Sequence, residues 1–343
     1  MQPLVLTRDP SLLDDLARLA AGAGVRPEVR SDAVSALASW ASAPLVLVGD
    51  DLLPDLVAVS PPRRAGVVVV CRDPGSATFR LALDVGASSV AELPSAEAHL
   101  AALFADVEEI PTQGLVLGVI GGAGGVGAST LACALGQVAG LTGPSLVLDT
   151  DPLGPGLDRV LGLDEVPGVR WDDLAASAGR LGSRSLRDAV PRRDGVGVLT
   201  WTSAGTSGSA ALPPVSTLRD VLAAGRRGHH LVVLDIARLS GAVSAELMAR
   251  CDLVLVVTPS SIGGVVSTMR VLASLSDTSH LRLAPRRGPV SASELSATTG
   301  VRIGLEVPHQ RGVDEAVDLG LGPVRGRRSR LRRAVSEFLA EVA

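Results

Sequence analysis

The chain has 343 residues, of which 46% are apolar, and its 32 basic residues face 36 acidic ones for a net charge of −4. This balance gives no overall electrostatic attraction to nucleic acid or to an anionic membrane, so sequence-specific nucleic-acid binding is not expected. The length and the apolar content suffice for two domains, each with its own core.

The first third of the chain alternates apolar runs with amphipathic stretches. The runs at 4–6, 45–48, 66–70 and 89–91 predict strands, and the stretches at 11–21 and 96–105 predict helices. Strands that alternate with helices form a parallel sheet covered on both faces. We therefore predict an α/β domain over 1–107 and a short acidic linker with one proline over 108–114.

The second part begins again with a strand at 115–120, a glycine-rich loop and a helix at 129–141. Further strands are predicted at 145–149, 197–201, 230–235 and 253–257, helices near 263 and at 312–319, and a surface loop at 202–217. No charged residue occurs between Glu109 and Asp149, which by hydropathy alone resembles a membrane span, but the glycines favour strand, loop and buried helix. We expect a second parallel-sheet domain over 115–343.

The glycine-rich loop reads GGAGGVGAST from Gly121 to Thr130. In the phosphate-binding pattern GxxxxGK(S/T), glycines let backbone N–H groups surround the phosphates, lysine reaches the β and γ phosphates, and the hydroxyl holds magnesium. The chain has alanine at the lysine position and contains no lysine at all. The predicted site for ATP or ADP with Mg²⁺ comprises Gly122, Gly124, Gly125, Val126, Gly127, Ala128, Ser129 and Thr130.

Three carboxylates follow predicted strands. Asp149 and Asp151 come after one strand, and Asp235 ends a later one. Because the carboxyl ends of parallel strands gather at one edge of a sheet, we predict a magnesium site made by Ser129, Asp149 and Asp235. The alternative is that these aspartates cap the helices that follow.

The order of these motifs resembles the MinD/ParA family of deviant P-loop ATPases. The corresponding segments are AGGVGAST from Ala123, DTD from Asp149, LVVLDIA ending at Ala237, and CDLVLVVTPSS from Cys251. The resemblance covers roughly 112–343 and implies a MinD/ParA-like fold. It also implies that Asp151 orients the attacking water.

Two departures from that family concern charge. The family's signature lysine falls on Ala123, and the usual P-loop lysine falls on Ala128. A charge-assisted phosphate contact is worth about 1.5 to 3 kcal/mol, so nucleotide binding weakens without being abolished. Hydrolysis depends more on electrostatic stabilisation, so we expect little or no turnover.

Within the family, the arrangement is similar to CpaE/TadZ proteins of pilus loci and to septum-site-determining proteins, which place a degenerate receiver-like (βα)5 domain before a MinD-like one. The segment LDVGASSVAELP resembles the end of a receiver domain, with Leu93 in place of its lysine. Asp50 or Asp51 stands at the phosphoacceptor position, and the acidic pair is reduced to Asp9. Phosphotransfer is therefore not expected, and the domain is interpreted as a protein-binding or dimerisation module.

The leading hypothesis is a regulatory protein that positions cell-division or Tad pilus machinery and binds those proteins as partners. An active ATPase that cycles on DNA or membrane, and a scaffold that binds no nucleotide, remain alternatives. A homodimer is left open. The first residues lack a signal-peptide pattern and the three cysteines lack CxxC spacing, so we expect a cytoplasmic protein, with recruitment to septum or pole also left open.

The C-terminus carries an arginine-rich stretch that runs into an amphipathic helix. Its apolar face holds Leu331, Val335, Phe338, Leu339 and Val342. Docking of this face on the domain is favoured over membrane or DNA contact. His229 and His230 are interpreted as surface residues, and the three tryptophans as isolated from one another.

Overall fold

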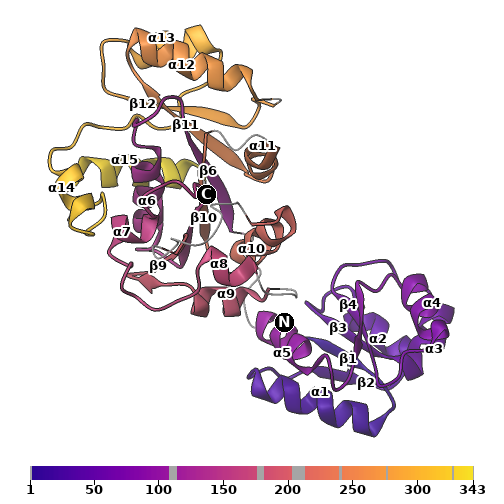
Figure 1. Cartoon of the computed structure of the whole chain (residues 1–343). Coiled ribbons are helices and arrows are strands. Elements are labelled where there is room, and N and C mark those ends of the chain that lie inside the picture. Colours follow the sequence, from indigo (N-terminus) through magenta and orange to yellow (C-terminus); the bar gives the residue numbers. More distant parts are fainter. Residues whose placement is uncertain are drawn as a thin grey trace. The chain divides into compact units, whose positions relative to one another are not determined.

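The computed structural model describes residues 2–107, 114–175, 181–202, 213–238, 242–275, 277–326 and 328–342 (Figure 1). The chain divides into two compact units, Met1–Pro111 and Thr112–Ala343, and each is considered by itself. Apart from Gly114, the predicted linker over 108–114 lies outside the described residues.

The N-terminal unit is a five-stranded parallel sheet in the order β2-β1-β3-β4-β5. Strands and helices alternate strictly along the chain. The strands are β1 (Leu4–Leu6), β2 (Glu28–Arg30), β3 (Val46–Gly49), β4 (Val67–Cys71) and β5 (Ser89–Glu92); the helices are α1 (Pro10–Gly22), α2 (Ala33–Trp40), α3 (Leu53–Val59), α4 (Ser76–Asp84) and α5 (Glu97–Val107). The sequence did not predict β2, because Val29 is its only apolar residue and is itself exposed.

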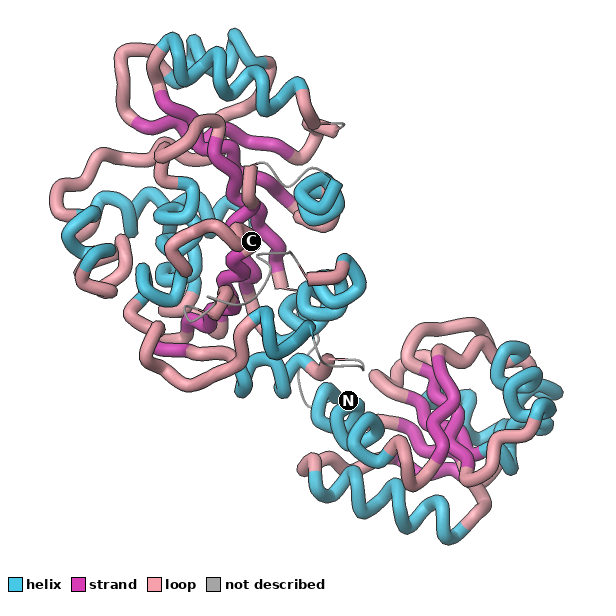
Figure 2. The backbone as a smooth tube through the Cα atoms, viewed as in Figure 1, coloured by secondary structure: helices cyan, strands magenta, loops and turns pink. Residues whose placement is uncertain are grey.

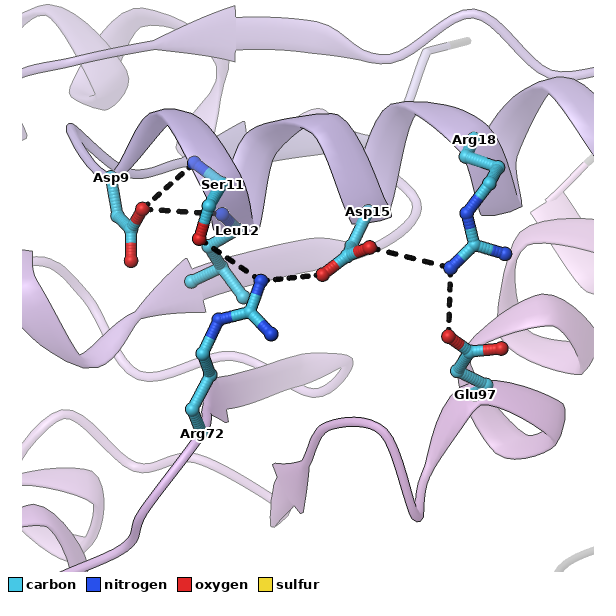
Figure 3. A network of polar contacts seen from close by, with 7 residues as sticks. All are labelled: Asp9, Ser11, Leu12, Asp15, Arg18, Arg72 and Glu97. Atoms are coloured by element: carbon cyan, nitrogen blue, oxygen red, sulfur yellow. Dashed lines mark hydrogen bonds and ion pairs between the residues drawn. The ribbon is translucent and has the colours of Figure 1, made fainter.

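Helices cover both faces of this sheet (Figure 2). Helices α1 and α5 share one buried core, and α2, α3 and α4 share the other. The α1 face is also joined by polar contacts: Arg72, just after β4, contacts Asp15 on α1 at 2.6 Å, and Arg18 on α1 contacts Glu97 on α5 at 2.7 Å (Figure 3). These arginines are about half exposed, so the ion pairs fix positions and add little stability.

The larger unit has a seven-stranded sheet in the order β12-β11-β6-β10-β7-β9-β8. Among the strands that the structure describes, β8 alone pairs antiparallel, with β9. The strands are β6 (Leu115–Gly121), β7 (Ser145–Asp149), β8 (Arg192–Arg193), β9 (Val196–Leu199), β10 (Leu231–Ile236), β11 (Leu253–Pro259) and β12 (Leu281–Arg286). Strand β6 lies between β11 and β10, in the interior of the sheet, and is almost wholly buried.

Helices also cover both faces of the larger sheet (Figure 1). One face carries α6 (Ala128–Ala139), α7 (Leu157–Leu161), α14 (Val313–Asp318) and α15 (Arg330–Val342). The other carries α8 (Trp171–Ala175), α9 (Ser183–Ala189), α10 (Val215–Gly228), α11 (Ala242–Met248), α12 (Ile262–Ala273) and α13 (Ala292–Thr299). The predicted fold class, a receiver-like (βα)5 unit followed by a parallel-sheet P-loop unit, agrees with this architecture.

Several local predictions need correction. The strand expected at 197–201 ends at Leu199, and α10 begins at Val215 inside the expected loop; residues 203–212 of that loop lie outside the described residues. His229 is buried, because it lies between the end of α10 and the start of the interior strand β10, and its Nδ1 is 3.0 Å from the Gly225 carbonyl oxygen of α10. Trp171 and Trp201 are not isolated, since their ring centroids lie 6.3 Å apart.

The C-terminal helix α15 docks as favoured from the sequence. Leu331, Val335 and Phe338 are buried in the same core as α6, and Leu339 and Val342 pack against it. This apolar face is therefore used within the unit. No helix within the described ranges is long and apolar enough to cross a bilayer.

Candidate functional site

The glycine loop connects the end of β6 to the start of α6. Gly125 and Gly127 have φ values of +67° and +88°, which only glycine adopts at little cost. Because glycine is also the N-cap residue of α6, that residue offers no side chain to cover the first amide groups of the helix. Such amide groups, together with the helix dipole, favour an anion.

Gly122 has a packing role that the motif does not reveal. A Cβ at this position would lie 2.2 Å from the Thr268 Oγ1 on α12. The Gly122 amide donates to the Val257 carbonyl oxygen at 2.8 Å, and its carbonyl oxygen accepts from the Ser267 hydroxyl at 2.7 Å. By contrast, Gly125 has open space around it, so the outer part of the loop is the part that a ligand can reach.

The two aspartates that end strands of the second unit lie at the same end of the sheet as the glycine loop. Asp149 on β7 and Asp235 on β10 are paired in register and are 1% and 4% exposed. The Ser129 hydroxyl, in the first turn of α6, lies close enough to the Asp235 carboxyl to affect its pKa. Burial raises the pKa of Asp235 to about 7, the Ser129 hydroxyl opposes that rise, and the nearby charges of Asp149 and Asp151 add to it.

Asp149 is occupied by contacts within the protein. One carboxylate oxygen accepts from the Asp151 amide at 3.1 Å, and the other accepts from the Thr200 hydroxyl at 2.7 Å and the Leu157 amide at 3.2 Å. Burial nevertheless raises its pKa to about 6. Asp149 therefore holds the loop that follows β7, which is closer to the capping alternative than to a free metal ligand.

Asp151, the candidate water-orienting residue, lies half-buried at the start of that loop. Its Oδ1 accepts from the Leu153 amide at 3.0 Å, and its carbonyl oxygen accepts from the Gly154 amide at 3.0 Å. One of the two carboxylate oxygens of Asp151 is thus used in a hydrogen bond within the turn.

The predicted magnesium ligands fit the ion in part. Within the described ranges, no group of three or more His, Cys, Asp or Glu side chains is arranged to hold a metal. Mg²⁺, however, commonly keeps several waters and takes only one or two protein ligands together with phosphate oxygens. The Ser129 and Asp235 pair meets that requirement without Asp149.

The two lysine positions carry short side chains. Ala128 packs against the core on the α6 face, and Ala123 is half-buried within the loop. Thr130 follows in the first turn of α6. Two arginines that the sequence did not single out lie beside this loop: Arg286 ends β12 and Arg238 follows β10. In the sequence, only their position at or just after strand ends could have indicated that these arginines lie near the loop.

The receiver-like unit has a different arrangement at its ligand edge. The carboxylate of Asp51 accepts from the Thr7 hydroxyl at 2.8 Å and from the Arg8 amide at 2.6 Å. Asp9 is the N-cap of α1, and its backbone bonds hold the pKa of its carboxyl below the ordinary value. Burial raises the pKa of Asp50. Leu93, at the lysine position, is 2% exposed.

Arginines from three segments surround a cavity of about 800 Å³ near the start of α15. In the sequence, only the C-terminal arginines stand out as a group. The structure adds to them one arginine just after β12 and residues from the loop before α14. The cavity is lined by Arg287, His309, Gln310, Arg311, Arg325, Gly326, Arg328, Ser329 and Arg330.

A family model described as the Rv3660c-like, CheY-like N-terminal domain matches residues 6–114. The uncharacterized protein Rv3660c of Mycobacterium tuberculosis strain H37Rv is 34% identical over 342 residues, covering 96% of this chain and 95% of that protein. The chain belongs to the Rv3660c-like family. Protein MT3760 of strain CDC 1551 matches this family member to the same extent.

Solved structures resemble the larger unit of this Rv3660c-like protein. A ParA family ATPase from Chlorobium tepidum has a TM-score of 0.59 at 15% identity, covering 68% of this chain and all of that one. The septum site-determining protein MinD from Pyrococcus horikoshii, complexed with Mg-ADP, has a TM-score of 0.54 at 20% identity, covering 66% and 95%. At these identities the likeness establishes a MinD/ParA-like fold.

Proposed function

We propose that this Rv3660c-like protein binds ATP or ADP with Mg²⁺ at the glycine loop and turns it over slowly or not at all. The observation that carries the proposal is buried Asp235, in register with Asp149 at the ends of β10 and β7, together with the start of α6, which has no side-chain cap and carries Ser129 in its first turn. In P-loop proteins a hydroxyl and a carboxylate at the positions of Ser129 and Asp235 hold the magnesium ion. Loop amides would then hold the phosphates.

Slow turnover follows from the two alanines. Phosphoryl transfer is accelerated mainly by charges aimed at the transferring group, and neither Ala123 nor Ala128 supplies one. Asp151 retains a carboxylate at the mouth of the site, although part of it is bonded within its own turn. Binding therefore survives the loss of lysine better than catalysis does.

The biological role we propose is the positioning of cell-division or Tad pilus machinery, with the receiver-like unit as a protein-binding or dimerisation module. Support comes from the combination of a CheY-like unit with a MinD/ParA-like fold, and from a fold neighbour that is itself a septum site-determining protein. Normal septa and normal pili in both deletion and overproduction strains would exclude this role.

Calorimetric titration of Mg-ATP and Mg-ADP into the full chain tests the site. We expect micromolar binding that disappears in the Ser129→Ala, Asp235→Ala double variant and persists in Asp318→Ala, which removes an exposed carboxylate at the end of α14. No heat at millimolar nucleotide would reject nucleotide binding. Steady phosphate release that is lost in Asp151→Ala would instead identify an active ATPase.

A second candidate, a scaffold that binds no nucleotide, is favoured by two contacts. Gly122 must be glycine for α12 to pack, and the Asp149 carboxylate accepts three hydrogen bonds within the protein. Both motif residues thus have structural reasons to be present. The same titration separates the candidates, since the scaffold gives no heat with either nucleotide.

A further inference from the structure

Arg286 places a guanidinium group on the glycine loop. Its Nη1 donates to the Val126 carbonyl oxygen at 3.0 Å, and a Cβ at Gly127 would lie only 2.9 Å from the same nitrogen. Glycine at 127 therefore makes room for the guanidinium, in addition to adopting its positive φ. The group lies beside the residue that precedes Ala128, the position of the missing P-loop lysine.

Arg238 approaches the other end of the loop. Its Nη2 lies 3.7 Å from the point that a Cβ on Gly124 would occupy. Gly124 follows Ala123, the position of the missing signature lysine. Each absent lysine thus has an arginine next to it, and both arginines come from strand ends that are remote in sequence from the loop, β12 and β10.

Neither arginine is neutralised within the described part of the chain. The ion pairs found there in the larger unit join other residues, such as Arg170 to Asp158, Arg219 to Glu246 and Arg226 to Asp252. A guanidinium has five N–H donors, and the Val126 contact of Arg286 uses one of them. The remaining donors and the full charge are free to meet an anion.

We infer that Arg286 and Arg238 replace the two missing lysines, so that a di- or triphosphate bound on the loop is held by arginines from β12 and β10. The inference rests on the proposed nucleotide binding. It adds which residues supply the positive charge that contacts the bound phosphates. Arg286 supplies the larger part, because it is fixed by a hydrogen bond to the loop. Guanidinium groups suit this role because they bind phosphate oxygens bidentately.

The test is calorimetry of the full chain with Mg-ATP and with inorganic tripolyphosphate, which contains the phosphate chain alone. Arg286→Ala should weaken both ligands about tenfold or more, and Arg238→Ala should weaken them less. Arg302→Ala, which removes an exposed side chain at a residue whose backbone carbonyl oxygen accepts from the Leu283 amide of β12, should change neither. Weaker dependence of affinity on salt in Arg286→Ala should accompany the loss.

Two further variants separate charge from folding. Arg286→Gln keeps an N–H donor for the Val126 carbonyl oxygen but carries no charge, so we expect it to bind as poorly as Arg286→Ala. Adding Ala128→Lys to Arg286→Ala should restore affinity, because the lysine returns a cation to the same phosphates. Unchanged melting temperatures without ligand would show that all variants fold.

The outcomes distinguish the two proposals. Wild-type protein that binds neither ligand would refute nucleotide binding and the arginine role together. Wild-type protein that binds, with Arg286→Ala and Arg238→Ala binding equally well, would refute the arginine role alone. Failure of Ala128→Lys to rescue Arg286→Ala would also count against it.

Discussion

The two units of this protein place carboxylates at the carboxyl edge of a parallel sheet, and each lacks the lysine expected there. In the receiver-like unit, the position is filled by Leu93, and Asp51 is bonded to Thr7 and Arg8 within the unit. In the P-loop unit, Asp235 is buried at the end of β10, near the Ser129 hydroxyl. The two arginines beside that loop have no carboxylate partner within the described ranges.

The effect of losing a lysine therefore differs between the two units. It depends on whether the carboxylates and backbone amides that remain find hydrogen-bond partners within the protein. At the receiver-like edge, Asp51 and Asp9 are hydrogen-bonded within the unit, whereas burial raises the pKa of the Asp50 carboxyl. The P-loop edge keeps a buried carboxylate, which is costly to leave unsatisfied, together with open backbone amides and two solvent-exposed arginines that have no ion pair in the described ranges. The second edge is therefore the one that a ligand completes.

The largest effect that tests this contrast is expected for Asp235→Asn. The pKa of Asp235 is raised from an ordinary value of 3.8 to about 7, so its contribution to stability is full below about pH 4 and is lost as the pH rises through 7. At about 1.4 kcal/mol per pH unit, ionisation costs on the order of 4 kcal/mol at pH 8. Asn does not ionise, so the variant should be more stable than wild type at pH 8.

Denaturant unfolding of both proteins at pH 4.5 and pH 8 measures this effect. The stability difference should shrink toward pH 4.5, and Mg²⁺ at pH 8 should stabilise wild type but not Asp235→Asn. Asp318→Asn, at an exposed position, provides the control. A difference independent of pH would show that Asp235 is not an uncompensated buried carboxylate.

A smaller effect distinguishes the two parts of the glycine loop. Gly122→Ala places a Cβ 2.2 Å from Thr268 Oγ1 and should reduce the free energy of unfolding by about 2 to 3 kcal/mol. Gly125→Ala enters open space and has only the cost of a positive φ, about 1 kcal/mol. Thermal unfolding of both variants gives the comparison, and the reverse order would contradict the packing role assigned to Gly122.

The smallest effects are expected in the receiver-like unit. Asp51→Asn loses acceptor capacity for Thr7 and Arg8, and should cost about 1 kcal/mol. Asp50→Asn removes a carboxyl whose pKa burial already raises, so stability at pH 8 should be unchanged or slightly higher. Calorimetric unfolding of the full chain measures both. Acetyl phosphate should phosphorylate neither aspartate. Stable phosphorylation of either one would contradict the expectation that this unit does not take part in phosphotransfer.

Much of the fold was predictable because its signals are local. Apolar runs bounded by polar turns predicted most central strands, including β1, β6 and β10. The edge strand β2 was not predicted, because a strand of three residues with little buried apolar surface is defined by its pairing with β1 and not by its own composition. The start of α10 at Val215 was missed because the N-cap residue is Pro214, whose side chain makes no capping hydrogen bond, and the serine- and glycine-rich stretch before it was read as one loop.

The sequence by itself determined the strand, glycine loop and helix, the alanines at both lysine positions, and the placement of Asp149 and Asp235 at strand ends. Only the tertiary structure decided that Asp149 is bonded to Thr200, that Gly122 packs on Thr268, and that Arg286 lies on Val126. The reason is physical. Motifs report neighbours along the chain, whereas these contacts join residues 51 to 160 positions apart and exist only once the sheet has set its strand order and register.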